Sequence, residues 1–351
     1  MMSVTPTLTG RRPAPLSLTT GLVGLVLAAS LLSLSSGAAG LGPVDLARAA
    51  LGEGLSPRDQ VVFYGIRLPR LAMGLMVGAA LAVAGTLLQG LFRNPLADPG
   101  IVGIGAGAGL GAVMAIVLGG ALPPVLAAWA GAGLVPVAAF AGGWGATMLL
   151  YRVATAGGRT DVAMMLLAGI ALAALAGAMT GVMVYMADDR QLRDLTFWSM
   201  GSLAGATWAK LAAALPLIGV ALGLALRSGR GLNALALGEA QAHHLGVDVQ
   251  RVKRGAIFGA AAATGAAVAI SGGIGFVGIV VPHLLRLAQG PDHRRLMPQA
   301  ALLGAALLVL ADLMARTVVA PAEVPIGLVT ALLGAPVFLW ILLRQRGVVR
   351  G

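Results

Sequence analysis

Ten long apolar runs, separated by short polar segments, make up most of this chain. Each run is close to the roughly 20 residues that an α-helix needs to cross the hydrocarbon core of a bilayer. The predicted spans lie near residues 16–39, 69–91, 100–120, 130–151, 162–187, 206–226, 254–271, 274–289, 298–319 and 326–343. We therefore expect an all-α integral membrane protein with ten transmembrane helices, organised as one domain over residues 1–351.

The first apolar run has two interpretations. Residues 1–15 are polar and carry Arg11 and Arg12, and the small residues from Ser35 onward are typical of a signal-peptide cleavage site. However, the run is longer than the usual core of a signal peptide, and the topology closes only if it is retained. We expect a retained first span, and leave its processing open.

Composition supports a membrane protein and narrows the functional classes. The mean hydropathy is +0.91, and 58% of residues are hydrophobic against 11% that are charged, a balance that no water-soluble domain could bury. Among the 52 glycines, Gly103, Gly107 and Gly111 are spaced by four, which favours close approach of helices in lipid. The absence of cysteine excludes disulfides and cysteine-ligated metal sites.

The distribution of basic residues predicts the orientation in the membrane. The net charge is +11, but the basic residues are scattered singly at the ends of apolar runs rather than forming a stripe, so we expect no nucleic-acid partner. Of the 24 Lys and Arg residues, 16 fall on the predicted inner side and 8 on the outer side. This bias predicts cytoplasmic tails over 1–15 and 344–351, spans 1–6 within 16–229, a cytoplasmic segment over 230–254, and spans 7–10 within 255–343.

The cytoplasmic segment Gly231–Arg254 is the extended polar passage between spans 6 and 7. Side chains from Leu232 to His243 recur at intervals of three and four, which predicts a short amphipathic helix that begins near Asn233 and ends at Gly246. A second short helix is expected to follow. Such a helix suits the groove of a partner protein, although a solvated connector is the alternative.

Two long outer segments are predicted at 40–68 and 188–205. The charges of the second exclude it from lipid, and its aromatic residues, with Trp208, suit an interfacial belt or a short helix on the outer surface.

Six strings, taken in order, identify a family. They are RLPR (67–70), LLQGLFRNPLADPGIVGIGAGAG (87–109), TFWSMGSL (196–203), LGEAQAHHLGV (237–247), GFVGIVVPHLLR (275–286) and ADLMARTVVAPAEVPIGLVTALLGAPVFLWIL (311–342). Together they resemble the permease subunits of binding-protein-dependent ABC importers for iron chelates, haem and cobalamin. The resemblance implies a type II ABC importer permease fold in the bacterial inner membrane, surrounded by lipid. It also implies three kinds of protein partner: a second copy of the chain, two ATP-binding cassette subunits, and a periplasmic substrate-binding protein.

The resemblance also implies roles for particular residues. The resemblance assigns docking of the binding protein to Arg67, Arg70 and Arg316. A local pair with Asp312 is the alternative for Arg316. It assigns coupling to the ATPase to the residues Leu237, Gly238, Glu239, Ala240, His243, Leu245 and Gly246. The translocation pathway falls on the fifth span, where Met179, Met183 and Met186 share one face, with core packing as the alternative.

Prolines predict structural turns. Asn94, Pro95 and Pro99 follow span 2, where they are expected to end the helix and fix a rigid turn. Pro282 lies inside span 8, where it frees backbone groups that protein or water must satisfy, as a kink or as a hinge.

No Walker motif is present, because Lys210 and Lys253 follow Ala and Val rather than a glycine loop. We therefore expect ATP and Mg²⁺ to be bound by a partner ATPase, and no cofactor to be bound by this chain. An ion-coupled transporter is disfavoured because the spans are almost free of ionisable residues, and a membrane enzyme because no catalytic arrangement is found. The segment 188–208 is most similar to haem permeases. Haem is the expected substrate, with ferric siderophores and then cobalamin as alternatives.

Overall fold

The computed structural model describes residues 15–37, 42–51, 54–100, 102–123, 125 and 131–349, so the predicted tail over 1–15 lies almost wholly outside the described residues. Eight helical segments in this part of the chain are long and apolar enough to cross a membrane. They are built from α1 (Pro15–Ser35), α4 (Leu68–Leu91) with the turns before it, α5 (Ile104–Leu118) with η2 (Gly119–Ala121), α7 (Leu134–Val153), α8 (Val162–Met186), α10 (Trp208–Ala236), α12 (Val249–Ser271) and α14 (His293–Thr317).

Two further apolar helices occupy the positions of the predicted eighth and tenth spans. They are α13 (Val277–Gln289), which is short, and α15 (Ile326–Val349), whose apolar part is Ile326–Trp340. The order of the apolar helices thus follows the sequence pattern, while the count of ten membrane spans stays a prediction.

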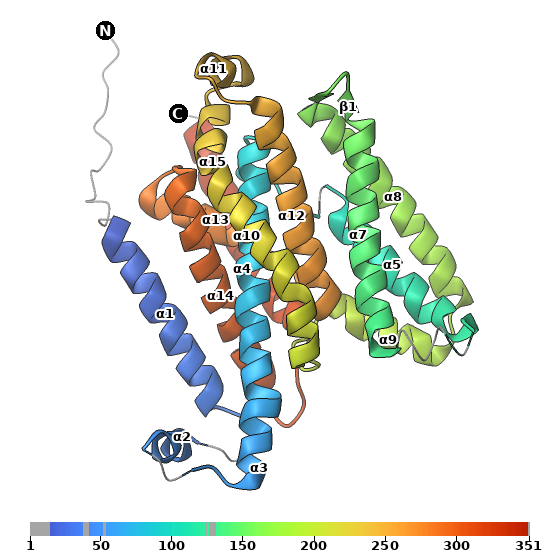
Figure 1. The fold of residues 1–351 in the computed structure, drawn as a ribbon, viewed down its shortest axis with the longest axis vertical. Helices are drawn as coiled ribbons and strands as arrows, with labels where there is room; N and C mark the ends of the chain where they lie inside the picture. Colours follow the sequence, from blue (N-terminus) through green and yellow to red (C-terminus); the bar gives the residue numbers. More distant parts are fainter. Residues whose placement is uncertain are drawn as a thin grey trace.

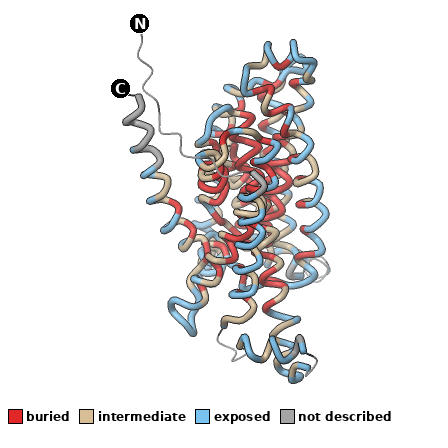
Figure 2. Tube along the Cα trace, turned by 90° about the vertical axis from the view of Figure 1, so that its left-hand side faces the viewer, coloured by how far each residue is buried: buried red, intermediate tan, exposed pale blue. Residues whose placement is uncertain are grey.

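Helices α4 and α12 form the centre of the bundle. Helix α4 packs against α10, α12, α13 and α14, whereas α1 lies at one edge against α14 and α8 at the opposite edge against α5 and α7 (Figure 1). Burial follows this arrangement, since buried residues gather along the middle of the bundle and exposed ones along its periphery and ends (Figure 2). The outer helices therefore present apolar side chains on the surface, as expected where lipid or a second subunit covers them.

Small residues set the spacing between helices. A Cβ at Gly78 of α4 would lie 2.3 Å from the carbonyl oxygen of Gly304 in α14, so these backbones touch. A Cβ at Gly107 would lie 2.5 Å from a backbone oxygen of α7, and one at Gly111 would lie 2.1 Å from another. The predicted glycine contact is confirmed for these two residues. It is wrong for Gly103, which caps α5 with φ of 78° and stands outside the helix.

The segments at one end of the bundle are more helical than predicted. Helix α2 (Pro43–Ala50) lies within the predicted loop 40–68. After it, one unbroken helical segment runs from α3 (Pro57–Gln60) through a stretch of π-helix, η1 (Val61–Arg67), into α4. Helix therefore occupies the last part of this loop. Ser56 starts it by accepting a hydrogen bond from the N–H of Asp59, and proline stands at the first helical position. The short surface helix expected within 188–205 is confirmed as α9 (Asp189–Met200).

The segment Gly231–Arg254, which is predicted to be cytoplasmic, is organised differently from the prediction. Helix α10 continues through Ala236, because Leu232 and Leu235 are buried, and α11 is only Glu239–His244. The expected second short helix is instead the first turns of α12, which Asp248 caps. A predicted single helix from Asn233 to Gly246 is therefore wrong, since the backbone turns at Gly238 with φ of 118°.

One small sheet departs from the all-helical expectation. Strands β1 (Thr155–Ala156) and β2 (Arg159–Thr160) form a two-residue hairpin between α7 and α8, with Gly157 and Gly158 both at positive φ in its loop. The hairpin lies at the same end of the molecule as α11, opposite α2 and α3 (Figure 1). The remaining short element, η3 (Gly131–Gly133), precedes α7.

Candidate functional site

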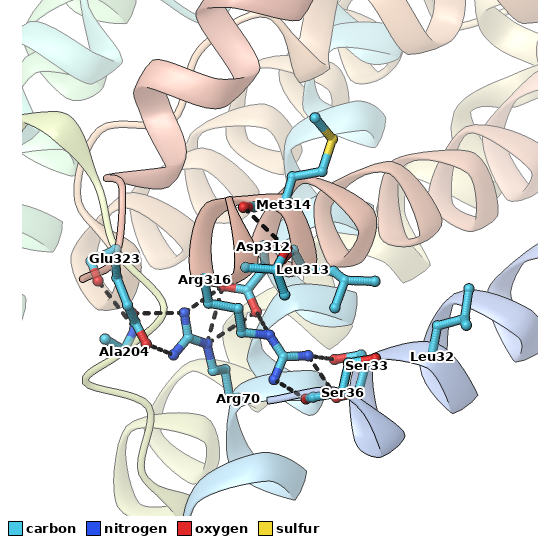
Figure 3. A network of polar contacts seen from close by, with 12 residues as sticks. Leu32, Ser33, Ser36, Arg70, Ala204, Asp312, Leu313, Met314, Arg316 and Glu323 are labelled. Atoms are coloured by element: carbon cyan, nitrogen blue, oxygen red, sulfur yellow. Dashed lines mark hydrogen bonds and ion pairs between the residues drawn. The ribbon is translucent and has the colours of Figure 1, made fainter. Parts of the chain in front are cut away.

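The three arginines predicted for docking meet at the end of the bundle opposite α11. Arg70, near the start of α4, is buried and bonds two carboxylates (Figure 3). Its Nε and Nη2 donate to the carboxylate of Asp312 at 3.0 and 2.9 Å, and its Nη1 and Nη2 donate to that of Glu323 at 2.8 and 2.9 Å. This fork geometry joins α4 to α14 and to the loop before α15.

The other two arginines hold the end of α1. Arg316 donates to the carbonyl oxygen of Ser36 at 2.9 Å and to the carbonyl and hydroxyl oxygens of Ser33 at 2.6 and 2.9 Å (Figure 3). Arg67 donates to the carbonyl oxygen of Leu34. These carbonyls end a helix and lack partners within it, so guanidinium groups satisfy them well.

The local pair weighed for Arg316 is present, because its Nε lies 3.7 Å from Oδ2 of Asp312. Sequence reasoning missed Glu323, whose partner Arg70 is 253 residues away. The hydrogen bonds from Arg70 lower the pKa of Glu323, which keeps that carboxylate ionised. In the structure the three arginines thus bond other residues of this chain, and their docking on a binding protein stays a prediction.

The predicted coupling residues surround α11 at the other end. Ala242 anchors the helix through apolar contacts with Leu235 and Val249. Leu237 and Leu245, on either side of it, are 65% and 64% exposed. Gly238, partly buried, and Gly246, exposed, both have positive φ, so they bend the chain at each end of α11.

The remaining coupling residues, Ala240 and His243, are exposed, while Glu239 is partly buried. Glu239, His243 and Gly246 line a cavity of about 660 Å³ together with Arg159, from the β-hairpin, and Asp248, ahead of α12. Leu237 and Leu245 are thus exposed apolar side chains next to α11, the kind of surface that a partner protein's groove can accept.

The methionines predicted for the pathway lie on α8 at the edge of the bundle. Met179 and Met186 are 43% and 60% exposed, and Met183 is partly buried. Most of α8 is exposed, since its buried residues are Met165, Gly169 and Ala176. The face is available to a second subunit, lipid or substrate, and the assignment of these methionines stays a prediction.

The chain turns after α4, at the residues predicted to follow span 2, and the kink or hinge at Pro282 stays a prediction. Helix α4 ends at Leu91, and the side chain of Asn94 accepts a hydrogen bond from the N–H of Leu96 at 2.9 Å, which forms a turn that contains Pro95 and precedes Pro99. Pro282 stands inside α13, and Gln89 of α4 donates to the carbonyl oxygen of Gly278 at 3.2 Å. That oxygen is the one that the missing N–H of Pro282 leaves without its helical partner.

Sequence reasoning did not find a cavity of about 550 Å³ between α5, α9, α12 and α13. Trp198, Phe276, Thr264 and Asp98 line it with several glycines. Burial raises the pKa of Asp98. These four residues come from separate parts of the chain, so no spacing pattern in the sequence indicates that they lie together. Within the described residues no three His, Asp or Glu side chains gather as a metal site.

Comparison with known proteins identifies the family. The FecCD transport family matches residues 25–344. The chain belongs to the FecCD transport family. Its members are permease subunits of ABC transporters, which agrees with the family identified from the six sequence strings.

Individual relatives span nearly the whole chain. It is 48% identical over 318 residues to the hemin transport system permease protein HmuU of Yersinia pestis, covering 90% of this chain and 93% of that protein. It is 47% identical over 295 residues to the cobalamin import system permease protein BtuC of Halobacterium salinarum, covering 84% and 76%. It is 42% identical over 323 residues to the vitamin B12 import system permease protein BtuC of Escherichia coli, covering 92% and 93%.

The fold also matches a solved structure. A metal-chelate type ABC transporter in an inward-facing conformation aligns with a TM-score of 0.81 and 32% identity, covering 94% of this chain and 100% of that chain. This FecCD-family chain is therefore a multi-pass ABC transporter permease.

Proposed function

We propose that this FecCD-family chain forms, with a second copy of itself, the membrane pathway of a binding-protein-dependent importer that carries haem from periplasm to cytoplasm. The observation that carries the proposal is the 48% identity to the hemin permease, which extends over 90% of this chain rather than over one motif. Haem also agrees with the sequence similarity of segment 188–208. The membrane is the bacterial inner membrane, and the excess of inner Lys and Arg supports cytoplasmic termini.

ATP hydrolysis in two partner ATP-binding cassette subunits drives this transport. The sequence has no Walker motif, so ATP and Mg²⁺ bind the partners and this chain binds no cofactor. Docking of those subunits on α11 is supported by its exposed flanking leucines, Leu237 and Leu245. A periplasmic binding protein delivers the substrate at the opposite end, near Arg67, Arg70 and Arg316.

Cobalamin is the second candidate substrate, because the Halobacterium salinarum and Escherichia coli relatives at 47% and 42% identity are cobalamin permeases. A ferric siderophore is the third, supported by the metal-chelate type transporter of similar fold. The machinery is the same for all three substrates.

An uptake competition experiment distinguishes the three candidate substrates. Cells that lack other haem, siderophore and cobalamin importers receive this permease with its cognate ATPase and binding protein, and labelled haem uptake is measured. The proposal expects uptake that unlabelled haem suppresses and that cobalamin or ferric siderophore at equal concentration leaves unchanged. Uptake of cobalamin or siderophore in place of haem would reassign the substrate while leaving the transporter class in place.

A further inference from the structure

Lys253, in the first turns of α12, is buried although it carries a charge. Its side chain is 2% exposed. An ammonium removed from water is unfavourable unless carboxylate or carbonyl oxygens replace the lost hydration. Its Nζ finds two, Oε1 of Glu239 at 2.7 Å and the carbonyl oxygen of Thr160 at 2.7 Å.

The two partners of Lys253 belong to different elements. Glu239 is the first residue of α11, and Thr160 is the last residue of strand β2. The ammonium group of α12 therefore contacts both the short helix and the hairpin.

Hydrogen bonds hold the hairpin against α12 at Thr160. The N–H of Thr160 donates to Oε1 of Gln250 at 3.0 Å, so both backbone polar groups of this residue bond side chains of α12. The next residue, Asp161, caps α8 by accepting from the N–H groups of Ala163 and Met164 at 2.7 and 3.0 Å. A displacement of Thr160 is thus passed directly to the first turn of α8.

Helix α11 has few other attachments. Its six residues bury only Ala242, and the chain on either side bends at Gly238 and Gly246. The carboxylate of Glu239 is therefore a principal polar contact that holds α11 against the bundle.

We propose that Lys253 is a positioning residue that couples α11 to α8. Displacement of α11 by a docked ATPase then shifts the first turn of α8 and with it the helix that carries Met179, Met183 and Met186 near its other end. This inference rests on the proposed function, in which α11 receives the ATPase, and on the predicted role of α8 in lining the pathway. The ion pair is by itself weak evidence of a contribution to fold stability, because apolar side chains often replace a buried ion pair without loss of stability.

The test follows the position of α8 while the ATPase works. The chain has no cysteine, so Met183→Cys places one thiol on α8 in the complete transporter, reconstituted with its ATPase and binding protein. The rate of maleimide labelling is compared between the ATP-free state and the state trapped with ATP and vanadate. Lys253→Met is added to this background, with Lys253→Arg as the variant that restores the charge.

Lys210→Met is the matched control. It removes the other lysine of the chain, whose Nζ bonds the carbonyl oxygen of Gly205 ahead of α10, far from α11. ATPase subunits retained on the purified permease, and ATP hydrolysed per substrate transported, are measured for every variant.

Lys253→Met is expected to retain the ATPase and to hydrolyse ATP, while the labelling ratio between the two states falls about tenfold, within the range typical of coupling between distant sites. Lys253→Arg should recover much of the ratio, and Lys210→Met should match the parent. An unchanged ratio in Lys253→Met with the ATPase bound would overturn the proposal.

Two further results are informative. If Lys253→Met fails to fold, Glu239→Gln decides in its place, since this partly exposed side chain can lose its charge without leaving a cavity; a reduced ratio supports the coupling, and an unchanged one overturns it. If the parent itself labels equally in both states, the pathway role of α8 fails and this inference fails with it. That outcome is distinct from a failure of Lys253 alone.

Discussion

The side-chain amide of Gln89 donates to the carbonyl oxygen of Gly278 at 3.2 Å, across the contact between α4 and α13. In a regular helix this oxygen would accept the N–H of residue 282, which is proline here. Arg286, one turn further along α13, donates to Oε1 of the same glutamine. Gln89 thus repairs the break in α13 and is itself held in place by that helix.

Replacing Gln89 with leucine should lower stability. The carbonyl oxygen of Gly278 would be left buried without a donor, which costs about 1–3 kcal/mol. In a Pro282→Ala background the new N–H can reach that oxygen, so the same change should cost less. Thermal unfolding of the four purified forms measures this, and the lost Arg286 contact cancels because both backgrounds lose it. Equal losses in the two backgrounds would show that the amide does not replace the missing N–H.

Arg67→Glu and Arg70→Glu should weaken association with the binding protein, and raised salt should weaken the wild-type complex. Because Arg70 also bonds Asp312 and Glu323, loss of binding alone does not separate docking from local damage. Glu323→Gln separates them, since it removes an internal partner and leaves the arginine.

If Arg70 docks the binding protein, Glu323→Gln should bind as tightly as wild type or more tightly in titrations on nanodiscs. Weaker binding in Glu323→Gln, with no salt dependence in wild type, would assign the network to structure alone.

The connection between α13 and α14 predicts a pH dependence. A hydrogen bond from Asn233 lowers the pKa of Asp292 below its ordinary 3.8, and one from the N–H of Arg294 acts in the same direction. A depressed folded-state pKa means that the ionised group stabilises the fold above pH 3.8 and that this contribution is lost as the pH falls through the folded-state value.

Asp292→Asn keeps a side chain that can cap α14 but cannot titrate. Its melting temperature should lie below that of wild type at neutral pH, and the gap should narrow as the pH is taken below 3.8. A gap of constant size across the acid range would refute the assignment.

Leu245→Asp should weaken ATPase binding. The leucine is 64% exposed beside α11, so a carboxylate is tolerated in the isolated permease but is unfavourable in an apolar partner groove. His244→Ala serves as the control, because it changes a neighbouring exposed residue without adding charge. Pull-down of the ATPase should fall for Leu245→Asp and hold for His244→Ala, with normal folding of both. Undiminished pull-down of Leu245→Asp would place the docking surface elsewhere.

The hydrophobic pattern predicted the helices well because membrane-length runs leave few alternatives. It placed their ends less well where a helix extends beyond the apolar run. Helix α10 reaches Ala236 since Leu232 and Leu235 pack on neighbours, and helix starts at Pro57 within the predicted loop. Such extensions depend on tertiary contacts, which hydropathy does not encode.

The candidate sites were predictable in location but not in their contacts. Motifs placed Arg70 at one end and Glu239 at the other, but Arg70 meets Glu323 across 253 residues. Lys253 looked like one more topology-determining charge and is in fact buried between two elements. Spacing along the chain reveals partners within one helix, whereas these contacts join separate elements.

The central claim is that this chain is the pathway of an ATP-driven haem importer. The most direct measurement is haem accumulation in proteoliposomes that contain this permease with its ATPase, with haem-loaded binding protein on the periplasmic side and ATP on the other. The account predicts accumulation that requires ATP and the binding protein together and is lost with a hydrolysis-deficient ATPase. Accumulation that proceeds without ATP, or ATP hydrolysis that the loaded binding protein stimulates with no haem entering, would contradict it.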